Sequence, residues 1–299
     1  MQTMKRVMIT GVSGFIGPHI VRSCLGNGWQ VIGISRNDYP DKHYDCFTFI
    51  KKETEKLSEV DFKNIDYVFH LAFATNIPHS IEKPVETTGD NIDGTVRLLD
   101  LATRADVKKF IFASTASVYG NNPIPWRENM SPDPIEPYSW QKLSCEYACR
   151  MWYKRYGLPT VIFRLFQVFG ENQRKDTVLS FFLKAKKEGQ PFTLTNAGTS
   201  RHPKSLERDF VYAGDVAEAF QKAAESKNTS QGEIINIASG KATPIEDIAK
   251  VIGGKIAWIS KRSYEVDKHQ ADITLAKKLL VWQPKIDVLY WLKNNPKML

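Results

Sequence analysis

Blocks of apolar and polar residues alternate along the chain in a way that predicts a regular succession of strands and helices. Residues 6–10 form a short apolar run, 15–28 show helical periodicity up to Gly26 and Gly28, and 29–34 form a second apolar run. The same reading gives strands at 66–72, 108–115 and 159–170, and helices at 91–107 and from residue 138. Continuous apolar strands alternating with helices indicate a parallel sheet covered on both faces.

The regular alternation of predicted strands and helices is interrupted in the second half of the chain. Residues 171–210 are polar and turn-rich and are predicted to be loops of a second lobe, whereas 211–226 and 233–238 return to the helix–strand pattern. The tail from 241 predicts two short amphipathic helices, one of them ended by Pro284. We therefore predict an α/β fold. A Rossmann-type, doubly wound parallel sheet occupies 4–166, with 209–238 returning to it, and a smaller C-terminal substrate-binding lobe is built from 167–208 and 239–299.

Composition narrows the class of protein. The 299 residues are 42% hydrophobic and 25% charged, as in an ordinary globular protein. The net charge of +8 comes from scattered lysines and arginines without a long basic run, which disfavours nucleic acid and suits an anionic small molecule. No stretch approaches the roughly 18 apolar residues of a membrane span. The four cysteines lack metal-ligand spacing, so we expect reduced thiols, a cytoplasmic location and no metal site.

A glycine-rich turn separates the first predicted strand from the first predicted helix. "TGVSGFIG" places Gly11, Gly14 and Gly17 at intervals of three residues. Glycines there permit a tight turn and close backbone approach, and the helix N-terminus behind them favours a pyrophosphate. The segment predicts a dinucleotide site that also includes Ser13, Phe15 and Ile16.

This glycine spacing resembles the GxxGxxG of the short-chain dehydrogenases/reductases, in particular the extended branch that acts on nucleotide sugars, the NAD-dependent epimerase/dehydratase family. Further motifs follow in the family's order: "HLAFAT", "DNIDGT", "FASTASVYG", "YSWQK", "RLFQVFG", "RDFVYAGDVAEA" and "ADITLAKKLLVWQPK". The resemblance implies a nicotinamide cofactor, a nucleotide-diphosphate sugar as substrate, and a homodimer formed by pairing helices, one of which would include Tyr138 and Lys142.

The cofactor contacts follow partly from chemistry and partly from the resemblance. An acidic residue about 20 positions after the glycine turn would bind the adenosine ribose, but Ser35 and Arg36 stand there instead. A hydroxyl and a guanidinium suit a 2′-phosphate, so NADP is slightly favoured over NAD. By resemblance, the nicotinamide half of the site is lined by Leu71, Ala72 and Thr75, and Asn91 supports it.

By the same resemblance, Thr115, Tyr138 and Lys142 form the catalytic triad. Tyr138 would act as the acid/base, and its pKa must fall by about three units from about 10 for it to be a base near neutrality. The positive charge of Lys142, and the position of Tyr138 near the start of a helix, are expected to supply this shift. Lys142 would also bind the nicotinamide ribose, and Thr115 the substrate oxygen.

The residues after Thr115 bear on the reaction. The family's dehydratases carry Asp-Glu at this place, whereas this chain has Ala116 and Ser117, so elimination lacks its base. Two reactions stay open. "STASVYG" resembles the 4-epimerases of the UDP-glucose and UDP-N-acetylglucosamine type, and "ISRN" favours an NADPH-dependent 4-ketosugar reductase. A non-catalytic NADP-binding regulator is a third alternative, which the retained tyrosine and lysine disfavour.

Substrate contacts carry over position by position. Gln167 replaces the family's asparagine with the same amide on a longer arm, while Arg208 and Arg262 resemble the arginines that hold the diphosphate. His70 follows an apolar strand, and Tyr119 lies in a loop; both are expected to have packing roles rather than catalytic ones.

Overall fold

The computed structural model describes residues 4–39, 44–175, 177–261 and 265–295. Its strands are β1 (Arg6–Thr10), β2 (Gln30–Ser35), β3 (Phe47–Lys51), β4 (Tyr67–His70), β5 (Lys109–Thr115), β6 (Thr160–Leu165), β7 (Gln167–Phe169), β8 (Phe192–Asn196), β9 (Glu207–Tyr212), β10 (Gln231–Ile237), β11 (Ala242–Pro244) and β12 (Ile256–Ser260). Its helices are α1 (Gly17–Gly26), α2 (Ile77–Glu82), α3 (Pro84–Thr88), α4 (Gly94–Arg104), α5 (Pro137–Tyr156), α6 (Val178–Lys187), α7 (Ala213–Glu225), α8 (Ile245–Ile252), α9 (Thr274–Leu280) and α10 (Val288–Asn294), with short turns η1 (Thr54–Lys56), η2 (Glu59–Phe62), η3 (Gly89–Asp93) and η4 (Ala116–Tyr119).

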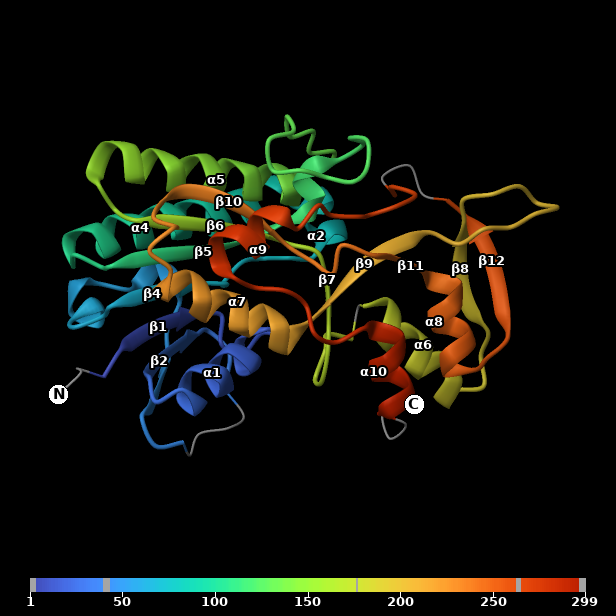
Figure 1. Cartoon of the computed structure of the whole chain (residues 1–299), viewed down its shortest axis with the longest axis horizontal. Helices are drawn as coiled ribbons and strands as arrows, with labels where there is room; N and C mark the ends of the chain where they lie inside the picture. Colours follow the sequence, from blue (N-terminus) through green and yellow to red (C-terminus); the bar gives the residue numbers. More distant parts are fainter. Residues whose placement is uncertain (1–3, 40–43, 176, 262–264, 296–299) are drawn as a thin grey trace.

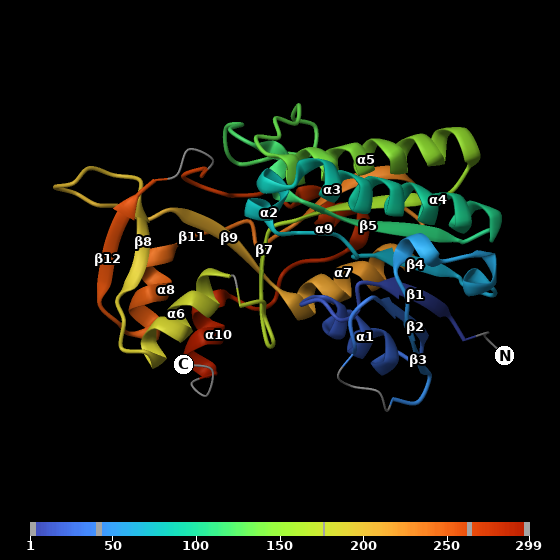
Figure 2. The ribbon, with the colours of Figure 1, turned by 180° about the vertical axis from the view of Figure 1, so that it is seen from behind.

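Seven strands form one parallel sheet in the order β10-β6-β5-β4-β1-β2-β3. The strand order reverses between β1 and β4, which makes the carboxyl edge at this point the expected ligand site. Helices cover both faces of the sheet: α4 and α5 lie on one, and α1 and α7 on the other (Figures 1 and 2). The predicted fold class, a doubly wound Rossmann-type α/β fold, is confirmed.

Two apolar cores hold these layers together. On one face, Ile20 and Val21 of α1 and Phe220 of α7 pack with strand residues. On the other, Leu98 and Leu99 of α4 and Cys145 and Cys149 of α5 do the same. Because every strand of a doubly covered sheet faces apolar side chains on both sides, the near-continuous apolar runs seen in the sequence are explained.

The smaller lobe carries a separate core. Two small sheets, β11-β9-β7 and β12-β8, pack with α6, α8 and α10 around Phe182, Phe192, Ile248 and Trp291. This lobe lies beyond the carboxyl ends of the large sheet, at the right of Figure 1. In the described part of the chain, no helix is long and apolar enough to cross a membrane.

Three local predictions are wrong. The run 159–170, read as one strand, is divided at Phe166 into β6, which pairs with β5 and β10 of the large sheet, and β7, which pairs with β9 of a small sheet. The segment 171–210 is more than loops, since it contains α6 and β8. The described tail has three helices rather than two, and α9 ends at Leu280, where Val281 turns to a positive φ of 49°, well before Pro284.

Candidate active site

One large cleft, of about 1090 Å³, runs along the carboxyl edge of the large sheet and reaches the smaller lobe. All the site residues predicted from the sequence that the structure describes line it: Gly11, Ser13, Gly14, Phe15, Ile16, Gly17, Ser35, Arg36, Leu71, Ala72, Thr75, Asn91, Thr115, Tyr138, Lys142, Gln167 and Arg208. Arg262 lies outside the described residues. Residues up to nearly 200 positions apart in the sequence are thus brought to one cavity.

The glycine turn fits an anionic dinucleotide. Gly11 has a φ of +75°, and a methyl group there would lie 2.7 Å from the backbone nitrogen of Ala72. At Gly17, a methyl group would lie 2.4 Å from the carbonyl oxygen of Val12. The first turn of α1 has no side-chain cap and no acidic residue, so its N–H groups and the helix dipole are available to a phosphate.

Beyond the glycine turn, polar side chains from the ends of β1 and β2 line the cleft. The hydroxyls of Ser13 and Ser35 hydrogen-bond to each other, and the N–H of Asn37 donates to the Ser35 hydroxyl at 3.2 Å. Arg36 is exposed beside them, and Lys52, which forms an ion pair with Asp61, lines the same end. Hydroxyl, amide and cationic groups therefore surround the place where the adenosine ribose is expected.

Asn91 fixes the loop that follows β4. Its side-chain oxygen accepts from the N–H of Ala74 at 2.7 Å, and its amide donates to Gln141 of α5 at 2.7 Å. This buried bridge ties the loop carrying Leu71, Ala72 and Thr75 to the helix that carries the Tyr–Lys pair. Asn91 thus holds this loop through its own amide group, and its role in the cofactor site stays a prediction.

The start of α5 places Tyr138 at the sheet edge. Glu136 caps the helix by accepting from the N–H of Ser139, and Pro137 takes the first helical position. Tyr138 hydrogen-bonds with Thr115, the last residue of β5, and this bond favours the phenolate. Burial outweighs it and raises the pKa of Tyr138 to about 12. The expected lowering of this pKa is therefore not found in this structure.

Lys142, whose charge was expected to lower the pKa of Tyr138, makes its direct contacts with other groups. Its ammonium group donates to the carbonyl of Ala113 at 2.6 Å and lies 3.6 Å from the ring centroid of Phe73 and 4.7 Å from that of Phe112. The charge is directed at these groups rather than at the phenol. Burial lowers the pKa of Lys142 to about 7, since desolvation penalises the charged form.

A buried ion pair connects the elements that carry Thr115, Tyr138 and Lys142. Glu146, one turn after Lys142, accepts two hydrogen bonds from Arg164 of β6 and one from Ser114, the residue before Thr115. Both charged side chains are almost fully buried, so each depends on the other for compensation. The pair locks α5 to β5 and β6 where the triad side chains emerge.

The far end of the cleft belongs to the smaller lobe. Gln167 lies at the start of β7, opposite Phe210 in β9, so it faces the cleft from the lobe side. Arg208 of β9 donates to the carbonyl of Glu207 at 2.8 Å, and burial lowers its pKa to about 10. A half-buried arginine that is held by a carbonyl group keeps further donors for an anion.

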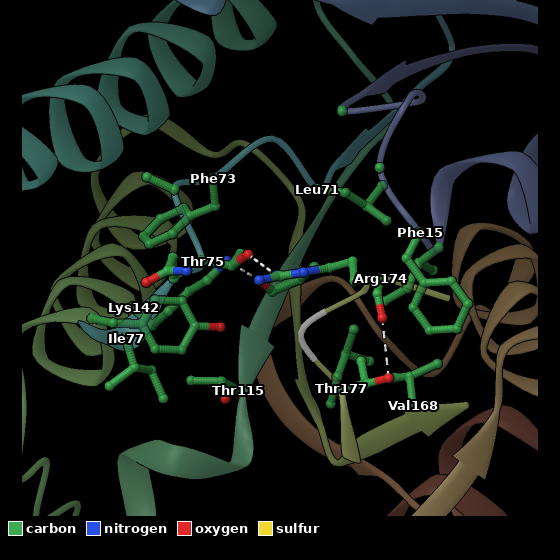
Figure 3. Close-up of a pocket in the computed structure, with 18 of the residues that line it drawn as sticks. Phe15, Leu71, Phe73, Thr75, Ile77, Thr115, Lys142, Val168, Arg174 and Thr177 are labelled. Atoms are coloured by element: carbon green, nitrogen blue, oxygen red, sulfur yellow. Dashed lines mark hydrogen bonds between the residues drawn. The ribbon is translucent and has the colours of Figure 1, made fainter. Parts of the chain in front are cut away.

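Sequence reasoning missed several residues that line the cleft. Phe73 contacts both Tyr138 and Lys142, and Arg174 reaches Thr75 from the loop before α6, as drawn in Figure 3. The "HLAFAT" motif places Phe73 beside predicted cofactor residues and gave a signal. Arg174 stood in a segment read as loop, which gave none.

His70 and Tyr119 have the packing environments expected of them. The His70 ring lies between the hydroxyls of Thr10 and Thr95, and burial lowers its pKa to about 3. Tyr119 stacks on Trp126 and donates to Asn236 at 2.7 Å. Neither residue lines the cleft.

A doubly wound sheet with a glycine turn at its switch point, and a Thr–Tyr–Lys set beside it, defines a nicotinamide-dependent enzyme of the short-chain dehydrogenase/reductase type. The model of the NAD dependent epimerase/dehydratase family matches residues 7–238. The chain belongs to this family.

Relatives and solved structures agree with this assignment. The chain is 31% identical over 314 residues to a putative UDP-glucose 4-epimerase of Methanocaldococcus jannaschii, with 97% of this chain and 99% of the relative covered. It is 32% identical over 312 residues to a UDP-glucuronate 4-epimerase of Thermodesulfobacterium geofontis, covering 96% and 94%. Among solved structures, UDP-glucuronic acid 4-epimerase of Bacillus cereus, in complex with UDP-glucuronic acid and NAD, superposes with a TM-score of 0.89 at 28% identity and 98% coverage of both chains.

Proposed function

We propose that the chain is a nucleotide-sugar 4-epimerase, of the type that acts on UDP-glucose or UDP-N-acetylglucosamine, and that it works by transient hydride transfer from C4 of the sugar. The observation that carries the proposal is the meeting of Thr115, Tyr138 and Lys142 in the cleft that also holds the glycine turn. An epimerase needs this combination, because oxidation and reduction must occur at one carbon without release of the ketone.

Each side chain has a part in the proposed reaction. Tyr138 takes the proton of the C4 hydroxyl and later returns it, while Thr115 hydrogen-bonds the same oxygen. Lys142 would bind the nicotinamide ribose, and its charge would favour the tyrosinate from its place beside the Phe73 ring, without a direct contact with the phenol. A bound nicotinamide supplies a reversible hydride acceptor. Turning the 4-keto sugar in the cleft then presents its other face.

The alternatives to a 4-epimerase are less well supported. Ala116 is buried, and Ser117 donates through its N–H to the Thr115 hydroxyl at 3.2 Å, so neither place after Thr115 offers a carboxylate for elimination. The 4-ketosugar reductase stays a second candidate only through Arg36. The relatives described above are a putative UDP-glucose 4-epimerase and UDP-glucuronate 4-epimerases, which supports the first candidate. A non-catalytic regulator would not need the retained Tyr138 and Lys142.

The nucleotide end of the substrate is assigned to the smaller lobe. We propose that Arg208, with Arg262, binds the diphosphate and that Gln167 contacts the sugar. The half-buried Arg208 lines the lobe side of the cleft, which supports this direction. UDP is the nucleotide in the B. cereus complex, and we propose it here.

Product analysis tests the function directly. The purified protein is incubated with a panel of UDP-, dTDP-, GDP- and CDP-sugars without added reductant, beside the variant Tyr138→Phe. We expect a new product of unchanged mass, formed from a UDP-sugar, and a loss of at least about a hundredfold in kcat in the variant. No product from any sugar, together with NADPH oxidation on supplying 4-keto sugars, would identify the reductase instead.

For the cofactor, we propose that the adenosine end accepts NADP at least as well as NAD. Arg36 beside Ser35 supports this, because a guanidinium and a hydroxyl match a 2′-phosphate. Titration of protein fluorescence with NAD and NADP measures both affinities. Arg36→Ala is expected to weaken NADP binding by about tenfold and to leave NAD binding nearly unchanged. Equal losses for both cofactors, or a clear preference of the wild type for NAD, would contradict the proposal.

We further propose a homodimer and a cytoplasmic location. One face of α5 presents Trp140, Tyr147 and Met151 at spacings of seven and four residues, and all three are exposed. A second copy of this helix is an occupant that the resemblance implies. The location rests on the four free cysteines, three of them buried, which fit a reducing compartment.

A further inference from the structure

We propose that Phe73 is a positioning residue for proton transfer: one ring holds the ammonium group of Lys142 and the ring of Tyr138 in place. The proposal rests on the proposed epimerase function, because it assigns a role within that site. It names a residue outside the Thr–Tyr–Lys set. The chain is expected to depend on an aromatic side chain, and not only an apolar one, at position 73.

The geometry of the ring carries the proposal. Phe73 is half-buried in the loop after β4, on the side of the cleft where Lys142 lies (Figure 3). The Lys142 nitrogen is 3.6 Å from the centroid of its ring, well within the roughly 6 Å of a cation–π contact. The same ring meets that of Tyr138 edge to face, with centroids 5.9 Å apart and planes at 78°. One side chain therefore touches both partners of the acid/base pair.

The other groups around Lys142 do not fully compensate its charge, so the Phe73 ring contributes to stabilising the charged amine. Phe112 adds a second ring at 4.7 Å, and the Ala113 carbonyl accepts from the ammonium group. Lys142 is faced by titratable groups of two elements, namely His70 of β4 and Cys145, Glu146 and Cys149 of α5. Arg164 of β6 is paired with Glu146. Tyr138 is faced by Glu136 and Arg174. Glu146 favours the charged amine but is already paired, so the ring faces offset part of the cost of burial.

The sign of the expected effect follows. Removing the ring while keeping apolar volume takes away an interaction that only the charged amine makes, so the pKa of Lys142 falls further. A less charged Lys142 stabilises the tyrosinate less, so the apparent pKa of Tyr138 rises. The rising limb of kcat against pH, which reports the base in the enzyme–substrate complex, then moves to higher pH. A purely structural role would lower kcat or stability without moving this limb.

The test compares Phe73→Leu, which loses the ring, with Phe73→Tyr, which keeps it. The pKa of Lys142 is measured by NMR on protein labelled with ¹³C at the lysine ε-carbon, with the signal assigned from Lys142→Met. We expect Phe73→Leu to lower this pKa by about 0.5 to 1.5 units and to move the rising limb of kcat to higher pH. Phe73→Tyr should leave the pKa and the limb at their wild-type values. Phe47→Leu, at a half-buried phenylalanine of β3 that does not line the cleft, is the matched control and should move neither.

Two outcomes decide between this proposal and the proposed function. An unchanged pKa of Lys142 in Phe73→Leu, or an equal fall in Phe73→Tyr, would overturn the role of Phe73. The expected NMR shift in a protein that converts no nucleotide sugar would support the contact between Phe73 and Lys142 and overturn the epimerase function. The NMR measurement needs no turnover, so the two failures are distinguishable.

Discussion

At the residue scale, the sequence predicted that Thr115, Tyr138 and Lys142 lie together, but not the electrostatics around them. Thr115, Tyr138 and Lys142 were identified from sequence motifs, and they meet in one cleft. The pKa of Tyr138 was expected to lie well below its usual value, but burial raises it and Lys142 turns to Ala113 and Phe73. Sequence spacing places side chains on a helix face, whereas rotamers and desolvation depend on neighbours from distant segments.

A residue-scale prediction concerns pH and stability. The pKa of His70 is lowered to about 3 by burial, so the folded state keeps this ring neutral while the unfolded chain protonates it below about 6.5. The unfolded state then binds more protons, so stability is present above pH 6.5 and is lost as the pH falls. Between pH 6.5 and 5 the loss from this one group is about 2 kcal/mol.

Urea unfolding at pH 7.5 and pH 5.0 measures this loss. His19 and His269, whose pKa values burial also lowers, contribute in the same direction. His70→Gln is expected to be less stable than wild type at pH 7.5, because the bonds to Thr10 and Thr95 change, but to lose less stability on acidification. The same fall in both proteins would show that His70 is not responsible.

At the element scale, long periodic segments were predicted well and short ones poorly. The strands of the large sheet other than β3, and helices α1, α4 and α7, follow apolar patterns that burial imposes, whereas α5 buries mostly polar side chains such as Gln141, Lys142 and Glu146. The break between β6 and β7 at Phe166 was hidden, because both strands are apolar and only their partners differ. α6 was missed although Val178, Leu179, Phe182 and Leu183 give it an apolar face, because polar, turn-rich segments flank it on both sides.

The exposed face of α5 gives an element-scale prediction. Tyr147 is 56% exposed on this helix although it is a large aromatic residue. If the proposed homodimer uses this face, Tyr147→Glu should convert the dimer to a monomer, because it would place two charges in an apolar contact. Light scattering after size-exclusion chromatography reads the mass. Tyr290→Glu, at a 61% exposed tyrosine of α10, is the control and should stay dimeric. A monomeric wild type would contradict the proposal.

At the scale of the whole molecule, the cleft is lined by residues of both the large sheet and the smaller lobe, between which the chain passes more than once. The division into 4–166 with 209–238, and 167–208 with 239–299, stays a prediction. The fold class needed only the alternation of strands and helices. The shape of the cleft needed tertiary contacts that no local pattern encodes, such as the Arg174–Thr75 bond and the position of Arg208.

The central claim is that C4 of the sugar is oxidised and then reduced inside one cleft, with no net change of the cofactor. UDP-glucose carrying deuterium at C4 tests it, with the product analysed by mass spectrometry and NMR. We expect a C4 epimer of unchanged mass that keeps the deuterium at C4, formed without added reductant and lost in Tyr138→Phe. Release of the deuterium to solvent, or a product that appears only with added NADPH, would contradict it.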